Sequence, residues 1–149
     1  MHRTIFGALG LAAILAACNS GAATTPITAC GPPANVSTVL VYPAPNATGI
    51  PDNFPYVVLG STAALPAYYQ VYVVNNTTGN AVYFNSVSTP PNPIPTPSAT
   101  PSFANPVYQS SGTPTGVSFV AGSSITVYLN NANNPNCVPA TALGTFTVQ

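Results

Sequence analysis

Side chains able to carry out acid–base or metal chemistry are almost absent from this chain. Its 149 residues include one basic residue, one acidic residue and one histidine, namely Arg3, Asp52 and His2. General acid–base catalysis needs a group that titrates near the working pH, and a serine nucleophile needs an adjacent base. Beyond residue 3 only Asp52 could serve, and paired-carboxylate chemistry is excluded. We therefore predict no catalytic residue and no enzyme.

Asp52 stands in the sequence Pro51-Asp52-Asn53, which is typical of a turn whose aspartate hydrogen-bonds its own backbone. Its alternatives are a lone calcium ligand or a catalytic carboxylate. A tight calcium site usually gathers several acidic oxygens, and zinc needs further Cys or His ligands, so we predict no metal and no cofactor. Proteins bind phosphate backbones through Lys and Arg, and this chain has neither beyond Arg3. We therefore predict that nucleic acid is not a partner.

The N-terminal segment predicts export and lipid attachment. Residues 1–17 have a basic start and an apolar run that is too short for a spanning helix, as in secretory signal peptides. The segment ends in Leu-Ala-Ala-Cys at residues 15–18, which resembles the lipobox of bacterial lipoproteins. The resemblance implies cleavage before Cys18, a lipid on its sulfur and an acyl group such as palmitate on its amine. The alternative is an ordinary signal peptide that contains a cysteine.

The same resemblance implies a place in the cell. Asn19 follows the lipidated residue where Asp would favour inner-membrane retention, so we expect a cell-envelope protein anchored in the outer membrane. Residues 18–29 are small and polar and form a predicted flexible tether that spans on the order of 40 Å at most. The membrane is thus a predicted partner through the lipid alone.

Cys30 and Cys137 are the two cysteines that remain. In an exported protein they lie in an oxidising compartment, which favours a disulfide between them. The alternatives are two free thiols or a metal pair, for which the chain offers few further ligands.

Short runs rich in Val, Ile, Tyr, Phe and Thr, broken by Pro, Gly and Asn, fill the chain from residue 36. No stretch after Cys18 has a helical period, and 18 prolines would interrupt most candidates. The pattern predicts an all-β fold whose strands are residues 37–42, 56–60, 68–74, 81–87, 106–110, 116–120, 124–130 and 144–149.

Alternation within two of these runs separates the core from the surface. The predicted inward side chains are Ile125, Val127 and Leu129 in one run and Tyr69, Val71 and Val73 in the other. The outward faces then carry three tyrosines, Tyr68, Tyr72 and Tyr128. Tyrosine combines apolar area with a polar hydroxyl and is favoured at interfaces, so these three form the candidate binding face. The alternative is ordinary cross-strand pairing on a solvated surface.

Residues 89–101 are rich in proline, which favours extended polyproline II. We interpret them as a stiff crossover between two sheets. The alternative is a ligand for an aromatic groove on a partner.

Three segments resemble bacterial immunoglobulin-like domains. Residues 42–51 (YPAPNATGIP) are similar to the opening of such domains. Residues 121–129 are similar to the entry of the sixth strand, both in these domains and in fibronectin type III modules. Residues 144–148 are similar to the last strand of immunoglobulin-like domains. Ile125 stands where fibronectin type III has its corner tyrosine, so the resemblance is to the immunoglobulin-like group. It implies that residues 30–149 form an antiparallel β-sandwich of seven to eight strands, with Cys30 near Cys137 and the tyrosine-bearing strands adjacent.

These observations predict a lipid-anchored, non-enzymatic envelope module with a structural, adhesive or protein-binding role. The alternatives are a module that binds carbohydrate or peptidoglycan through Tyr68, Tyr72 and Tyr128, and an accessory subunit of a larger envelope complex.

Overall fold

The computed structural model describes residues 30–134, 136, 137 and 142–149. The predicted signal peptide, the predicted lipidation site Cys18 and the predicted tether to residue 29 lie outside the described residues. Within the described ranges no helix is long and apolar enough to cross a membrane.

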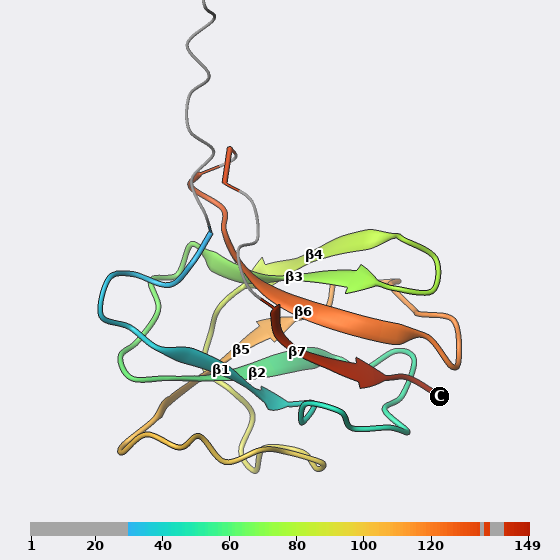
Figure 1. Cartoon of the computed structure of the whole chain (residues 1–149), viewed down its shortest axis with the longest axis horizontal. Helices are drawn as coiled ribbons and strands as arrows, with labels where there is room; N and C mark the ends of the chain where they lie inside the picture. The colour runs from blue at the N-terminus through green and yellow to red at the C-terminus, as the bar shows by residue number, and fades with distance from the viewer. Residues whose placement is uncertain (1–29, 135, 138–141) are drawn as a thin grey trace, which may run out of the picture.

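Seven strands form two antiparallel sheets, which confirms the predicted all-β sandwich (Figure 1). One sheet has three strands in the order β1-β2-β5 and the other has four in the order β4-β3-β6-β7. The strands are β1 (Thr38–Tyr42), β2 (Tyr56–Ser61), β3 (Tyr69–Asn75), β4 (Ala81–Ser86), β5 (Val107–Gly112), β6 (Ser124–Asn131) and β7 (Ala142–Thr147).

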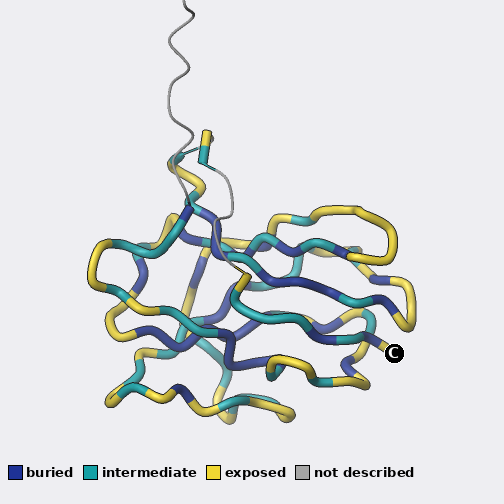
Figure 2. The backbone as a smooth tube through the Cα atoms, viewed as in Figure 1, coloured by how far each residue is buried: buried dark blue, intermediate teal, exposed yellow. Residues whose placement is uncertain are grey.

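The core lies between the sheets and is centred on Phe54, which precedes β2. Its ring stacks on Phe119 at a centroid distance of 5.4 Å and meets Phe146 edge-on at 5.1 Å. The inward residues predicted on β3 and β6 are all buried, as predicted from their alternation. Figure 2 shows this burial along the central strands, whereas β4 and the loops are largely exposed.

The predicted strand at residues 116–120 is wrong. Gly116 has a φ of +80° and lies in a turn, and residues 117–120 pair with no strand. The amide of Phe119 instead donates to the carbonyl of Asp52 at 2.9 Å. The apolar residues of this run are explained by Phe119, whose buried ring closes one end of the core.

Residues 46–50 lie along the outer edge of β7. The amide of Asn46 donates to the carbonyl of Thr145, and the amide of Thr147 donates to the carbonyl of Ala47. Ile50 and Val148 form a parallel bridge. The chain thus leaves the three-stranded sheet after β1 and covers the edge of the other sheet, which would otherwise expose unpaired backbone groups.

The proline-rich segment forms a layer over the outer face of the three-stranded sheet. It links β4 of one sheet to β5 of the other, which confirms the predicted crossover (Figure 1). The amide of Ala99 donates to the carbonyl of Val41, and the amide of Ala44 donates to the carbonyl of Pro97. Ile94 packs against a second apolar cluster formed by Val41, Tyr42 and Val58. We call residues 89–101 the proline layer.

The predicted disulfide is present. Cys30 and Cys137 are joined with a Cα–Cα distance of 5.2 Å and a sequence separation of 107. The bond ties the beginning of the sandwich to the segment that follows β6.

Candidate functional site

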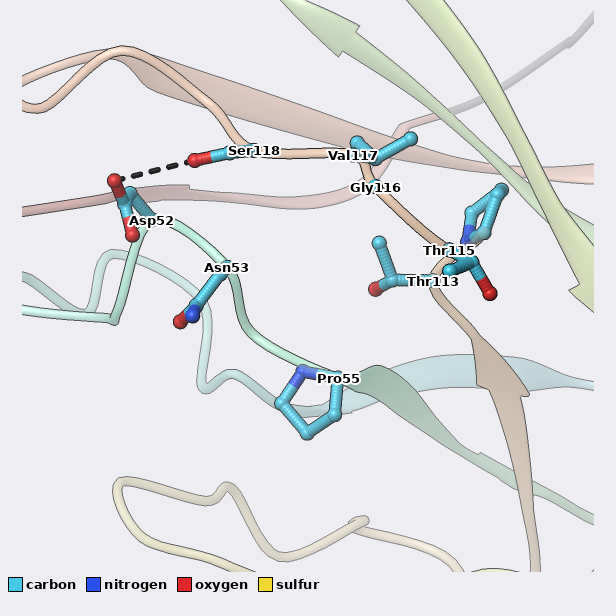
Figure 3. A pocket seen from close by; sticks show the side chains of 9 residues that line it. Asp52, Asn53, Pro55, Thr113, Thr115, Gly116, Val117 and Ser118 are labelled. Carbon is cyan, nitrogen blue, oxygen red and sulfur yellow. Dashed lines mark hydrogen bonds between the residues drawn. The ribbon is translucent and has the colours of Figure 1, made fainter.

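Asp52 lies in a turn, as predicted, at the rim of a shallow depression (Figure 3). One carboxylate oxygen, Oδ2, accepts a hydrogen bond from the hydroxyl of Ser118 at 3.2 Å. The carboxylate was predicted to accept a hydrogen bond from its own backbone. It instead accepts one from Ser118, which lies in a loop 66 residues away in the sequence.

The depression has a volume of about 600 Å³ and is lined by Asn53, Pro55 and residues 113–118 besides Asp52. Asp52 is the one ionisable side chain among them, and a serine beside a carboxylate lacks the proton acceptor that a histidine provides in hydrolases. No group of three potential metal-binding side chains occurs in the part of the chain that the structure describes. The depression therefore gives no basis for assigning catalysis or metal binding.

The outer face of the four-stranded sheet carries a row of three tyrosines from three strands. Tyr72 on β3 lies directly opposite Tyr128 on β6, with ring centroids 5.9 Å apart. On its other side Tyr72 meets Tyr83 of β4 at 4.7 Å. The structure thus brings together two of the three predicted tyrosines on adjacent strands. We call Tyr83, Tyr72 and Tyr128 the tyrosine ladder.

Tyr68 does not join the ladder, and Tyr83 takes its place. Tyr68 precedes β3 and its ring contacts that of Tyr69 at 5.2 Å. Tyr83 is the most exposed member of the ladder, with 55 % of its surface accessible. The sequence contained a signal for it, because Phe84 next to it is buried and alternation places Tyr83 on the opposite face.

A second hollow adjoins the ladder and is lined by amide side chains. Gln70 lies two residues before Tyr72 on β3 and directly opposite Asn130 on β6. Together with Asn131, Asn134 and Tyr83, among others, they surround a space of about 250 Å³. We call this the amide hollow, and Tyr83 is the residue that connects it to the ladder.

Hydroxyl groups border the ladder on its other side. The side-chain oxygens of Thr126 and Thr145 are 3.1 Å apart, and the hydroxyl oxygen of Thr126 accepts a hydrogen bond from the side-chain amide nitrogen of Asn76 at 2.8 Å. The ladder therefore lies between two polar but uncharged borders.

The environment disfavours ionisation of Tyr72, the central residue of the ladder. Partial burial raises the pKa of Tyr72 above its ordinary value, and the neighbouring phenols of Tyr83 and Tyr128 raise it further. Burial likewise raises the pKa of Tyr42 and of Tyr69. All three are therefore neutral phenols, able to donate a hydrogen bond, at neutral pH.

The free energy of unfolding should accordingly be constant between about pH 5 and pH 9, because the disulfide prevents Cys30 and Cys137 from titrating and no other side-chain type in residues 30–149 has its reference pKa in that window. Above about pH 10 the unfolded chain releases its tyrosine protons before Tyr42, Tyr69 and Tyr72 do so in the folded state. Stability should therefore fall as the pH rises further. Urea denaturation at a series of pH values, with phenolate absorbance recorded in parallel, measures this profile. A midpoint that shifts substantially between pH 5 and pH 9 would contradict it.

Comparisons of the chain with family models, with curated proteins and with solved structures find no significant match. Two surface features remain as candidate sites on geometric grounds. The Asp52 depression offers one carboxylate and a few hydroxyl groups. The tyrosine ladder with the amide hollow offers aromatic area and several hydrogen-bonding groups on adjacent strands, and it is the better candidate for ligand contact.

Proposed function

We propose that this chain is a lipid-anchored, non-enzymatic immunoglobulin-like module of the bacterial cell envelope that acts in adhesion by binding a partner through the tyrosine ladder. The observation that carries the proposal is the continuous contact of three partly exposed tyrosine rings, at 4.7 and 5.9 Å, on one sheet face. Such rings contribute large contact area at low cost in side-chain entropy.

The immunoglobulin-like assignment draws support from the strand order. Immunoglobulin sandwiches place the third, sixth and seventh strands in one sheet, and variable-type domains add a further strand beside the third. The four-stranded sheet here has β4 beside β3, followed by β6 and β7. Adhesive and receptor domains frequently use this architecture, although fold alone does not determine function.

The non-enzymatic role draws support from the side chains at hand. Past residue 3 the chain contains one ionisable side chain besides tyrosine and cysteine, Asp52, and its visible partner is a serine hydroxyl. Such a chain offers surface and hydrogen bonds, whereas proton transfer near neutral pH needs groups that it does not contain.

The anchored location draws support from the lipobox at residues 15–18 and from the disulfide, which suits an oxidising compartment. Acylation at sulfur and amine gives the two or more chains that stable anchoring requires. The tether then holds the sandwich close to the outer membrane.

Photo-crosslinking of the full-length protein in intact envelopes tests the proposal. The chain has no lysine for amine-reactive reagents, so a photoreactive amino acid is placed at Ser86, which lies opposite Gln70 beside the ladder. We expect adducts whose yield falls at least fivefold in the variant Tyr72→Ser/Tyr83→Ser, since the aromatic contact area is lost.

The matched control is Tyr68→Ser, which removes an exposed tyrosine whose ring contacts Tyr69 rather than the ladder. Its adduct yield should equal that of the wild type, and circular dichroism should show that both variants fold. Adducts that form equally well without the ladder, or no adducts in a folded wild type, would refute the proposal.

A further inference from the structure

We infer that the ladder and the amide hollow form one extended site for an uncharged polysaccharide, which stacks its sugar rings on the tyrosines and places hydroxyl groups in the hollow. This inference rests on the proposed function and assigns its ligand class. It joins two features that touch at Tyr83, which is both the outer member of the ladder and part of the wall of the hollow.

The ladder suits a long ligand. Its rings come from β4, β3 and β6 and follow one another across the sheet at 4.7 and 5.9 Å. The C–H faces of a pyranose ring stack favourably on the electron-rich faces of aromatic rings. Adjacent rings are tilted by 45° and 49°, so the platform is faceted rather than flat. A chain whose successive sugar units are turned relative to each other fits such a surface better than a single planar molecule does.

The hollow suits hydroxyl groups. Each amide side chain presents an N–H donor and a carbonyl acceptor close together, and each sugar hydroxyl also donates and accepts. Gln70 and Asn130 lie opposite each other on adjacent strands, and Asn134 comes from the loop beyond β6. The half-buried side chain of Gln70 lines the hollow and makes no hydrogen bond to another described residue. Gln70 is thus placed to bond a ligand without losing a structural contact.

The absence of cationic side chains selects an uncharged ligand. Residues 30–149 contain no Lys, Arg or His, so a carboxylate, sulfate or phosphate at this face would lose hydration without gaining an ion pair. Glycans rich in uronate or phosphate are therefore disfavoured. A protein partner would bury the ladder equally well, but it would need a separate hydrogen-bonding group for each amide of the hollow. A polysaccharide carries hydroxyl groups along its whole length and can therefore form hydrogen bonds with all of these amides.

The test uses the full-length protein in detergent micelles and affinity electrophoresis through gels that contain laminarin, dextran, mannan or, as the anionic probe, alginate. We expect retardation by at least one neutral polysaccharide and none by alginate. Tyr83→Ser should weaken the retained interaction at least tenfold, and Gln70→Leu, which keeps the size but removes the amide, about fivefold. Tyr68→Ser should remain within twofold of the wild type.

The photo-adduct formed at Ser86 provides the second measurement. Sugar analysis of the purified adduct should detect neutral hexose. If the adducts require the tyrosine ladder but contain only protein, the inference is overturned while the proposed function stands. Retardation by alginate equal to that by neutral probes would also overturn it. If adducts do not depend on the ladder and no probe retards the protein, the proposed function fails together with the inference.

Discussion

The free energy of unfolding of the double variant Cys30→Ser/Cys137→Ser should be about 4 kcal/mol lower than that of the wild type, because the disulfide closes a very long loop. The two residues are separated by 107 positions, nearly the full length of the sandwich. Cutting this link frees the unfolded chain, which gains entropy, while the folded strands keep their pairing. Urea denaturation followed by circular dichroism measures the difference.

Reduction supplies the control for this prediction. A thiol reductant should lower the stability of the wild type to about that of the double variant and should leave the variant unchanged. Cys30 is buried beside Asn130, whose side-chain oxygen lies 3.5 Å from its sulfur, so part of the loss reflects altered packing there. A loss below about 1 kcal/mol would contradict the loop-closure account, since it would mean that the unfolded chain is already restricted.

Gly60→Ala should lower the free energy of unfolding by about 1–3 kcal/mol, because a methyl group at this position has no room. A Cβ built on Gly60 would lie 2.8 Å from Cγ of Pro101 and 3.1 Å from Cγ2 of Val41. Pro101 is buried, and its ring cannot rotate away as the end of a long side chain could. The proline layer must therefore lift from β2, which uncovers the apolar cluster beneath it.

Gly31→Ala is the matched control, since a Cβ there meets no atom within 4 Å. We expect its stability to stay within about 0.5 kcal/mol of the wild type. Alanine is otherwise preferred to glycine in a strand by roughly 0.5–1 kcal/mol, so an unchanged or more stable Gly60→Ala protein would show that the proline layer does not press on β2. Urea denaturation of both variants decides between these outcomes.

Local alternation was sufficient to predict most strands and the faces of two of them. Ile125, Val127 and Leu129 are buried in β6 because side chains of a strand point alternately to opposite faces, whatever the rest of the chain does. Residues 116–120 have a similar run of apolar residues, but they do not form a strand because Gly116 has a positive φ. Phe119 shows that a buried aromatic residue in a loop produces a pattern similar to that of a strand.

The sequence was sufficient to predict that the candidate site consists of tyrosines, but not which three tyrosines form it. Tyr72 and Tyr128 share a face because of alternation, and their pairing follows from the adjacency of β3 and β6. Tyr83 meets Tyr72 through the register between β3 and β4, which shifts between Gln70 and Tyr72. Register of this kind depends on contacts between distant segments and on the turn that joins them.

The available chemistry and the class of fold are therefore predictable from the chain alone, because both follow from which side chains are present and how they alternate. The shortage of ionisable groups, the three cysteines and the β-like runs are all properties of the chain before it folds. Three features became known only from the folded arrangement: the proline layer covers the three-stranded sheet, residues 46–50 cover the edge of β7, and Tyr83 replaces Tyr68 beside Tyr72. Each of these depends on pairing between segments far apart in the chain, and the spacing of residues along one segment carries no information about its neighbour.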